Sequence, residues 1–440
     1  MTKHRTERRG NVCVFVAACL TVLMGVIAIA IDGGVLMDDR QKVQSSADAS
    51  ALAAAEQLFL NWQSEQGLDP TGKARDAALA LAASNGYTND GVASIITPNL
   101  IDSRSSGIGL GVKETAVHGV WVPPATGDYK GRSGYVEVAI QFNQKRHFGG
   151  IYGTENIPVR ARAVAEGGWR AGRDGILVLD PLSSASLNVT GNGTMAVLGA
   201  PIIVNSKASD AATAVGGATV SSDKSIDITG IPGIGGSGTW LGTINSGVPP
   251  TPDPLAYLPE PSPSGMTPYN KVNVAGQRTV TINPGCYNGG IAVSGQATLI
   301  MNPGIYYMNG GGFSFTGQGN LVANGVMIVN APSSNSDVIN INGTGSIQLS
   351  PPTTGIYRGI SLWQVRSSTN SINITGNGGS SMTGTFYAAH GTLNVTGNGD
   401  NDVLGSQYIS YQVKVNGGGT FRVNWDPNLV ARTRIIRLVE

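Results

Sequence analysis

The acidic side chains that a polysaccharide-cleaving site needs are scarce in the C-terminal part of the chain. Glycoside hydrolysis uses two carboxylates at a set separation, and elimination uses a basic residue beside acidic metal ligands. Between residues 271 and 430 the acids are Asp337, Asp400, Asp402 and Asp426, and Glu is absent. Asp400 and Asp402 share one Gly-Asp-Asn-Asp turn, which we interpret as a solvated turn rather than a calcium site. No catalytic pair of carboxylates is predicted.

The histidines and glycine-rich turns give no stronger signal. His390 lies in an Ala-His-Gly turn near Tyr387, without a Ser, Cys or carboxylate at a recognisable motif, and His118 and His147 are isolated. We interpret all three as polar turn residues. No Lys-Ser or Lys-Thr follows glycines in the frame of a phosphate-binding loop. The sequence therefore predicts no catalytic residue, no cofactor and no metal site, and hence a protein that is not an enzyme.

Six aromatic residues of the C-terminal part are of types that stack on sugar rings. They are Trp363, Tyr387, Tyr408, Tyr411, Phe421 and Trp425. Aromatic side chains in solenoids more often fill the core or cover its edges. We expect such positions for these residues, and a sugar-stacking face is the alternative.

A repeated pattern positions these side chains. Residues 187–193, 372–378 and 393–399 are near copies of apolar-Asn-apolar-Thr-Gly-Asn-Gly. Looser versions end at Gly230, Gly295, Gly317, Gly343 and Gly417. Several steps between the shared glycines are about 20–22 residues, and others lie near two or three times that value, which is typical of a solenoid. The predicted fold of residues 172–430 is therefore a large all-β parallel β-helix.

The chemistry of one repeat agrees with this fold. The apolar-x-apolar triplet turns two side chains inward, and stacked coils bury them while each strand pairs with the next. The Thr-Gly-Asn-Gly run bends the chain, so we expect positive φ at Gly376 and Gly397. Because Asn188, Asn373 and Asn394 occupy one position of the repeat, we expect them to stack as an amide ladder.

Two segments depart from the repeat. Residues 231–270 are rich in proline, above all from Pro249 onward, and such density excludes a central strand. Leu255 and Leu258 favour an excursion packed on the solenoid over a flexible spacer. Residues 431–440 form a basic amphipathic tail, which we expect to cover the last coil and its open strand edge.

An uncharged apolar stretch, Asn11–Ile31, is long enough to cross a hydrocarbon core of about 30 Å as a helix. The residues before it are basic (Lys3, Arg5, Arg8 and Arg9), and Asp32 follows it. Positive charge stays on the cytoplasmic side. Residues 1–35 are therefore predicted to be a cytoplasmic stub and a transmembrane anchor. Length and flanks favour an anchor over a cleaved signal peptide.

Composition limits the partners and the compartment. The net charge is +1 and only 13% of the residues are charged, which gives no reason to expect nucleic acid as a partner. The 62 glycines with ordinary apolar content indicate turn-rich β structure rather than disorder. Cys13 and Cys19 lie in the apolar stretch and Cys286 stands alone outside it. The exported part therefore has neither an intrachain disulfide nor a zinc cluster of cysteines.

Residues 36–171 are predicted to form a helix and then a small α/β module. Residues 37–60 lack Gly and Pro and carry apolar residues at near-helical spacing, and Gly33-Gly34 is expected to loosen the join to the membrane helix. A second helix is expected from Asp69 to Ser84. Alternating apolar and polar residues then predict half-buried strands at 135–142 and 157–165.

Several distinctive phrases of the N-terminal region occur together. Arg9-Gly10 precedes the apolar helix, Asp32-Gly33-Gly34 follows it, and residues 148–153 precede Val159-Arg-Ala-Arg-Ala-Val-Ala165. Over roughly residues 8–170 the chain resembles TadG-like Flp-pilus assembly proteins. The resemblance implies a membrane-anchored protein linked to tight-adherence pilus machinery, without catalytic residues.

Many members of that family continue with a von Willebrand A domain, whose metal motif follows a hydrophobic strand. Here Asp180 ends such a strand, but Leu182 stands where the first serine ligand belongs. A hydroxyl-poor site cannot complete an oxygen shell around Mg²⁺, so no metal site is expected.

These observations predict a membrane-anchored extracytoplasmic structural or interaction protein, linked to Tad/Flp-type pilus assembly or to cell-surface adhesion. The alternative is a carbohydrate-binding or polysaccharide-degrading β-helix carried by a TadG-like anchor. Expected partners are inner-membrane lipid, pilus-assembly or envelope proteins, and a surface polysaccharide. The expected location is a single pass through the inner membrane, with the N-terminus in the cytoplasm and the bulk of the chain outside it.

Overall fold

The computed structural model describes residues 11–90, 94–96, 119–145, 156–376, 379–397 and 402–440. The chain divides into two compact units, residues 1–169 with 434–440 and residues 170–433, and each has its own hydrophobic core. A long N-terminal helix, a small α/β module and a large parallel β-solenoid confirm the predicted fold class.

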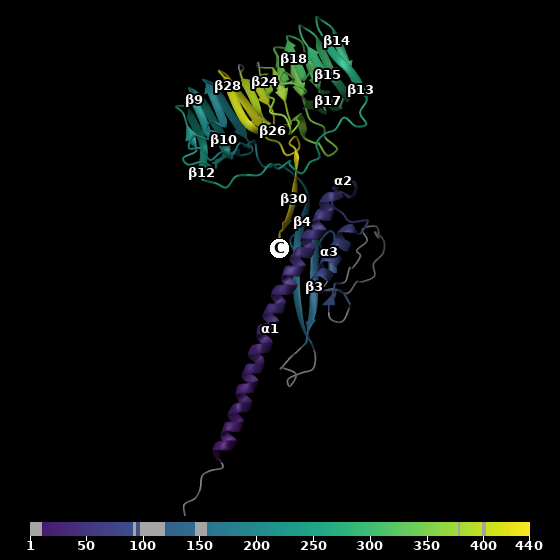
Figure 1. The fold of residues 1–440 in the computed structure, drawn as a ribbon, viewed down its shortest axis with the longest axis vertical. Helices are drawn as coiled ribbons and strands as arrows, with labels where there is room; N and C mark the ends of the chain where they lie inside the picture. The colour runs from purple at the N-terminus through teal and green to yellow at the C-terminus, as the bar shows by residue number, and fades with distance from the viewer. Residues whose placement is uncertain (1–10, 91–93, 97–118, 146–155, 377–378, 398–401) are drawn as a thin grey trace, which may run out of the picture. The chain divides into compact units, whose positions relative to one another are not determined.

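Helix α1 (Asn11–Leu60) runs without interruption from the apolar stretch into the module (Figure 1). Its first part is exposed, with Val14 at 72% and Phe15 at 71%, and is long and apolar enough to cross a membrane. From Val43 onward one side is buried. The expected loosening at Gly33-Gly34 is wrong. Each glycine costs a helix only about 1 kcal/mol, and the cooperative helix on both sides continues through them.

The module of the first unit is an antiparallel sheet packed on helices. Its sheet order is β1 (Ser94–Ile95), β3 (Tyr135–Gln144), β4 (Ile157–Ala171) and β30 (Arg432–Leu438), and β2 (Gly119–Trp121) also pairs with β3. Helix α1 packs on β3 and on α3 (Lys73–Ser84), and α2 (Trp62–Glu65) lies between the two helices in sequence. Helix α1 also approaches β4 closely, because the residues at that contact are small. A Cβ on Gly167 of β4 would lie 1.8 Å from the carbonyl oxygen of Ala55 of α1.

The C-terminal tail does not cover the last coil of the solenoid, contrary to the prediction. It forms β30, which takes the place beside β4 in the first unit's sheet. Arg437 pairs with the buried carboxylate of Glu166 at 2.9 Å, and Arg162 pairs with Glu137 at 2.6 Å and with Glu440. Because the tail alternates apolar and basic residues, a sheet edge that offers acidic partners accommodates it as a strand.

Strands β5 to β29 form one sheet of parallel strands wound into coils (Figure 1). Their bounds are β5 (Ile176–Val178), β6 (Leu187–Gly191), β7 (Thr194–Leu198), β8 (Ile202–Val204), β9 (Ala212–Gly216), β10 (Thr219–Ile228), β11 (Ile234–Gly235), β12 (Thr239–Ser246), β13 (Pro268–Val274), β14 (Thr279–Ile282), β15 (Gly285–Val293), β16 (Thr298–Met301), β17 (Gly304–Asn309), β18 (Phe313–Gly317), β19 (Leu321–Ala323), β20 (Val326–Ala331), β21 (Ile339–Gly343), β22 (Ile347–Leu349), β23 (Ile360–Gln364), β24 (Ile372–Gly376), β25 (Ser380–Met382), β26 (Thr385–Gly397), β27 (Asp402–Leu404), β28 (Gln407–Gly417) and β29 (Thr420–Asn424).

The pairings arrange these strands in three columns, which we call faces A, B and C; the long strands bend across two faces. Face A stacks β13, β15, β17, β20, β23, β26, β28, β5, β8, β10 and β12. Face B stacks β13, β15, β18, β21, β24, β26, β28, β6, β9 and β11. Face C stacks β14, β16, β19, β22, β25, β27, β29, β7, β10 and β12. The inward side chains of all three form one core.

The order of coils in space differs from their order in the chain. The chain enters the stack in its interior with β5, β6 and β7, and builds outward to β12 at one end. It restarts at the opposite end with β13 and builds back until β28 and β29 pair with β5, β6 and β7. Figure 1 shows β12 and β13 at opposite ends of the solenoid. The first and the last coil are therefore neighbours.

The segment between β12 and β13, residues 247–267, connects the two ends. It packs on the solenoid, as favoured from the sequence: Leu255 is 0% and Leu258 3% exposed. Asn205 holds the backbone of Thr251 by two hydrogen bonds, of 2.7 and 2.8 Å. We call residues 251–260 the strap. The strands reach to Ser246 and resume at Pro268, so the segment without strands is shorter than the predicted excursion 231–270.

The repeat motif lies mostly on face B, where its glycines and asparagines stack. The amide of Asn394 donates to the side-chain oxygen of Asn373 at 2.8 Å, which is the expected ladder. Asn188 continues the same position, but Lys414 lies between it and Asn394. The loose copy at 226–230 belongs to face A instead, since Ile226 pairs with Ile202. Its Ile-Asp-Ile-Thr-Gly pattern resembles the motif but does not determine the face.

The expected positive φ at Gly376 is wrong. Gly376 has no positive φ, and a Cβ there would lie 2.4 Å from Oδ2 of Asp402, so this glycine is required by close packing rather than by the turn. For Gly397 the turn residues 398–401 lie outside the described residues. Gly191 and Gly317 do have positive φ, +103° and +107°.

Candidate functional site

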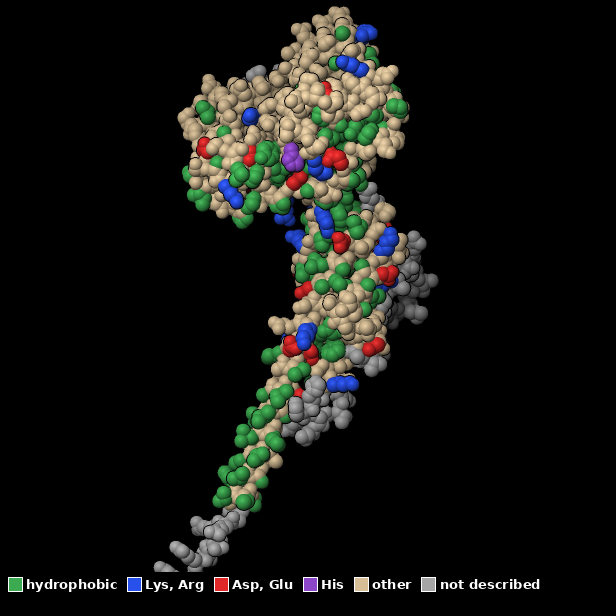
Figure 2. Space-filling model, in the orientation of Figure 1, with side chains coloured by type: hydrophobic (Ala, Val, Ile, Leu, Met, Phe, Trp, Pro, Cys, Tyr) green, Lys and Arg blue, Asp and Glu red, His purple; other side chains and the backbone are tan. Residues whose placement is uncertain are grey.

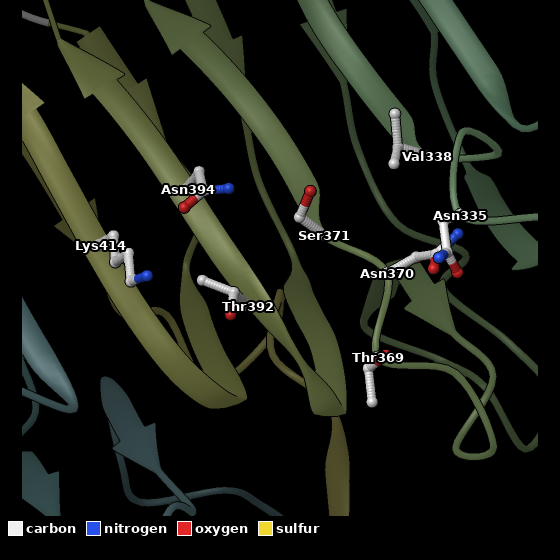
Figure 3. A pocket seen from close by; sticks show the side chains of 8 residues that line it. All are labelled: Asn335, Val338, Thr369, Asn370, Ser371, Thr392, Asn394 and Lys414. Carbon is white, nitrogen blue, oxygen red and sulfur yellow. The ribbon is translucent and has the colours of Figure 1, made fainter. Parts of the chain in front are cut away.

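A polar groove lies on the outer side of face B. It has a volume of about 370 Å³ and is lined by Asn335, Val338, Thr369, Asn370, Ser371, Thr392, Asn394 and Lys414. Figure 3 shows Asn394 and Lys414 on neighbouring strands and Asn335 and Asn370 together on the loops beside them. The strand residues come from positions that alternate with the buried ones, so the core fixes their direction.

The loops that border the groove are held by a carboxylate. Oδ2 of Asp337 accepts hydrogen bonds from the backbone and hydroxyl of Ser333, both at 2.9 Å, and from the backbone N–H of Ser334 at 3.0 Å. Partial burial opposes the charged form, but these donors outweigh it and lower the pKa of Asp337 to about 2. Asn370 donates to the carbonyl oxygens of Ser334 and Asp337. The groove therefore has a fixed wall of amides and hydroxyls.

This lining can recognise a ligand but is poorly suited to break one. Amides and hydroxyls donate and accept hydrogen bonds, which suits the hydroxyl groups of a saccharide. Lys414 is the one charged side chain of the lining, and none of the eight lining residues is a carboxylate. The carboxylate of Asp337 is engaged by the serines of its own loop. The groove thus offers binding chemistry without the acid–base pair of a glycosidase.

The other carboxylates named from the sequence have separate places. The solvated turn expected for Asp402 is wrong, because this residue begins β27, is buried and accepts from the backbone N–H of Ser380 at 3.3 Å. Asp426 accepts from the backbone N–H of Asn428 at 2.8 Å. Asp400 lies outside the described residues. Among the parts of the chain that the structure describes, no group of three His, Cys, Asp or Glu side chains is placed to hold a metal ion.

Asp180 caps a turn. Its Oδ1 accepts from the backbone N–H groups of Leu182 and Ser183, both at 3.0 Å, and Oδ2 accepts from Gln412 at 2.7 Å. Burial raises the pKa of this carboxyl, but the hydrogen bond from Gln412 and those from the turn hold it below its ordinary value. The residue in the metal-motif frame is thus saturated with protein donors.

His390 is the one histidine within the described residues, and it lies on a strand rather than in the predicted turn. His390 is exposed on β26, and its ring stacks on that of Tyr411 at 6.5 Å between centroids. His118 and His147 lie outside the described residues.

Three of the six aromatic side chains named from the sequence are core residues. Trp363, Tyr387 and Tyr408 are each 0% exposed, and the indole N–H of Trp425 donates to the carbonyl of Gly172 at 2.9 Å. The side chain of Phe421 lies outside the described part. The three core rings therefore cannot belong to a sugar-stacking face, whereas Tyr411 and Trp425 are only partly buried.

A partly buried charged cluster lies under the strap, and the sequence does not predict it. Nη2 of Arg366 donates to the carbonyl of Leu255 at 2.7 Å, Nη1 donates to the carbonyl of Leu258 at 3.1 Å, and its guanidinium lies 4.8 Å from the ring centre of Trp363. The indole of Trp363 donates to Glu260 at 2.9 Å. The one sequence feature that could have indicated this cluster is an Arg three residues after a Trp. Its partners, about a hundred residues away, were not readable.

The cluster extends to Tyr387 on the next coil. The Tyr387 hydroxyl donates to Asp253 at 2.7 Å and accepts from Nε of Arg366 at 2.7 Å. Burial and the negative charge of Asp253 raise the pKa of Tyr387 far above its ordinary value. The phenol is therefore neutral at any physiological pH, and its role is to hold the strap.

Comparison with known proteins gives one match. The model of the family described as putative Flp pilus-assembly TadE/G-like matches residues 10–57. No curated protein and no solved structure matches the chain. The matched residues cover the apolar part of α1 and nearly all of its buried part. The chain thus carries a Flp pilus-assembly TadE/G-like segment at its N-terminus, and the module and β-solenoid that follow lie outside the match.

Proposed function

We propose that this protein is a membrane-anchored scaffold of the cell envelope that presents the β-solenoid outside the inner membrane for Tad/Flp-type pilus assembly or surface attachment. The observation that carries the proposal is the continuity of α1. One helix contains the membrane-length apolar stretch, the TadE/G-like match and the side chains buried in the module.

Continuity gives the anchor a mechanical role. Val43, Ala47, Ala51, Ala54 and Leu58 of α1 are at most 1% exposed, so the module is built around the upper part of the same helix. A force on the extracytoplasmic part reaches the membrane through helical hydrogen bonds instead of a flexible linker. This suits a component whose module is attached firmly to the membrane.

The charge pattern supports the orientation. Lys3, Arg5, Arg8 and Arg9 precede the apolar stretch, and positive charge is retained in the cytoplasm. Residues beyond Gly33 are then extracytoplasmic. Protease added to spheroplasts should degrade the solenoid of the wild-type protein. Protection of the solenoid while a periplasmic control protein is degraded contradicts this orientation.

The scaffold role is tested by uncoupling the helix. In one variant, a Gly-Ser linker of ten residues is inserted after Gly34, and in a matched control four alanines are inserted there to keep the helix continuous. In a strain lacking the native gene, the alanine variant should restore piliation or attachment and the flexible variant should not. Equal restoration by both variants, at equal protein levels, refutes a role for helix continuity.

Carbohydrate binding is a second candidate because of the polar groove. Asn394 and Lys414 offer an amide and an ammonium donor to sugar hydroxyls or to a carboxylated sugar, while the amide of Asn370 fixes the loop beside them. Binding of the purified full-length protein to envelope polysaccharides should be lost in Lys414→Ala and kept in Lys271→Ala, a control at an exposed lysine of β13. Equal binding by both variants excludes the groove. We expect no cleavage of the polysaccharide.

A further inference from the structure

The two ends of the solenoid expose cross-sections of the same core. Apart from Ala208, the hydrophobic residues that pack on the core while only partly buried lie in the outermost coils. At one end they are Ile244 on face A, Ile234 on face B and Trp240 on face C, and at the other end they are Tyr269 on face A, Val272 on face B and Val280 on face C. Each end therefore presents one apolar side chain per face.

On two faces these residues share a register. On face B, successive pairings join Val272 through Ile291, Phe313, Ile339, Ile372, Leu393, Val413, Leu187 and Ala212 to Ile234. On face C, Val280 and Trp240 likewise lie at opposite ends of one column. A second solenoid stacked one strand spacing beyond the first, in the same register, brings Ile234 to Val272 and Trp240 to Val280.

The strand edges at the two ends are complementary. Among the described strands, β12 pairs only with β10, β13 only with β15, and β14 only with β16. All strands of the stack are parallel. The free edge of β12 faces one way along the stack, and the free edges of β13 and β14 face the other way. Two such edges from different molecules can therefore pair as neighbouring strands do within one molecule. At the β12 end the edge strand of face B is β11, which among the described strands pairs only with β9. Pro268 lacks a backbone donor, which removes one hydrogen bond from a ladder on face A.

The molecule already contains one junction of this kind. Strands β28 and β29 pair with β5, β6 and β7, although the chain does not pass from one coil to the other at that place. Register there is set by the side chains alone: Val413 pairs with Leu187 and Gly417 with Gly191. Coils of this protein thus recognise each other without a covalent connection between them.

Charge at the ends favours unlike ends. Lys271 and Arg278 are exposed at the β13–β14 end, and residues 268–336 contain no acid. The coil that ends in β12, residues 226–246, carries Asp227 as its single charge. Figure 2 shows basic side chains at the end where Figure 1 labels β13 and β14. Contact between two β13–β14 ends brings like charges together, whereas contact between unlike ends does not.

We propose that the solenoid binds a second copy of this chain head to tail, with the β11–β12 edge of one molecule pairing in parallel with the β13–β14 edge of the next. The same register that stacks coils within one molecule then stacks molecules. Such a contact does not close on itself, so it produces an open row of solenoids.

The first test blocks each end of the full-length protein in detergent micelles. Trp240→Asp blocks the β12 end, Val280→Asp blocks the other end, and Leu198→Asp, at a 38% exposed side chain of β7, is the control. By mass photometry, wild type and Leu198→Asp should form concentration-dependent dimers and longer species. Each blocked variant alone should be monomeric, and an equal mixture of the two should give dimers and nothing longer. A monomeric wild type, or a blocked variant that still dimerises alone, overturns the proposal.

The second test leaves the inward-facing residues of both end coils other than Cys286 unchanged. Leu241 and Thr281 occupy one outward column of face C at opposite ends. Docked copies place them one strand spacing apart, about 4.8 Å, which a disulfide can bridge. With Cys13, Cys19 and Cys286 replaced by Ala, Leu241→Cys and Thr281→Cys proteins should cross-link to each other on mild oxidation, and neither should cross-link to itself. Self-cross-linking of either variant, or no cross-link in the mixture, refutes the head-to-tail contact.

Discussion

Gly191 on β6 tests the junction between the first and the last coil of the solenoid. It has φ +103°, and a Cβ at this position would lie 2.3 Å from the carbonyl oxygen of Gly417 on β28. Gly276 provides a matched control: its φ is +80°, and a Cβ there would meet no atom within 4 Å. Both substitutions to Ala strain the backbone, but only Gly191→Ala also forces two coils apart.

The magnitudes follow from this difference. An unfavourable φ costs about 1–3 kcal/mol, and overpacking against a backbone that must move costs about 1–3 kcal/mol more. We expect Gly191→Ala to destabilise the solenoid by about 2–6 kcal/mol and Gly276→Ala by about 1–3 kcal/mol. At about 2–4 °C per kcal/mol for a large domain, the two melting temperatures should differ by about 2–12 °C.

Circular dichroism of the full-length protein in detergent measures the melting temperatures, and hydrogen–deuterium exchange locates the effect. In Gly191→Ala, protection should fall in β28 (Gln407–Gly417) as well as in β6, since Gly417 and Gly191 are paired. If both variants melt together, or if β28 keeps its protection, the stacking of the last coil on the first is wrong.

Three further perturbations have defined outcomes. Burial raises the pKa of Asp174 to about 6 from its ordinary 3.8, so the folded state binds this proton more tightly than the unfolded chain. The melting temperature should therefore fall as pH rises from about 4 through 6, and this slope should be absent in Asp174→Asn. Arg366→Ala removes two hydrogen bonds to strap carbonyls and the stacking on Trp363, so limited proteolysis should cut within residues 247–267, whereas Arg278→Ala should be as resistant as wild type. Gly33→Ala with Gly34→Ala should leave thermal stability of the module unchanged and Gly34→Pro should lower helix content by circular dichroism, because α1 is continuous through both positions.

The fold could be predicted from the sequence where the repeat motif recurs, because its apolar and turn residues are required by the local geometry of a strand and a turn. Leu393 and Ile372 begin two copies of the motif, and the structure pairs them directly. The alternation around them predicted which side chains are buried, since period two follows from strand geometry. The burial pattern also holds at Ile226, but the motif did not place that strand on the correct face, because it states that a strand and a turn occur and not which face the strand belongs to. That depends on the lengths of the preceding turns, which vary from coil to coil.

The repeat also predicted the column of strand residues that forms one side of the polar groove, although not the groove itself. Asn394 and Lys414 stand at one repeat position and stack as that position requires. The other wall comes from the long turns that hold Asn335 and Asn370, and their placement depends on Asp337 and its serine donors. No periodic signal marks such a turn. The strap cluster was hidden for a related reason, because Arg366 binds backbone carbonyls, which every sequence offers equally.

The order of the coils was beyond the sequence, and it decides how the solenoid can be used. The edge of a coil can pair with any other coil in the same register. The pairing of Leu187 with Val413 therefore needs no direct chain connection between their two coils. The result is that the residues entering and leaving the solenoid lie together: the N–H of Gly172 donates to the carbonyl of Ala431 at 3.0 Å. A solenoid that threads from one end to the other has a chain terminus at each end surface. Here both termini leave from the interior of the stack, so the connection to the rest of the chain uses neither end. The partly buried Trp240 and Val280 are uncovered for that reason, and the same arrangement that hid the fold from the sequence leaves two complementary surfaces available for a second copy.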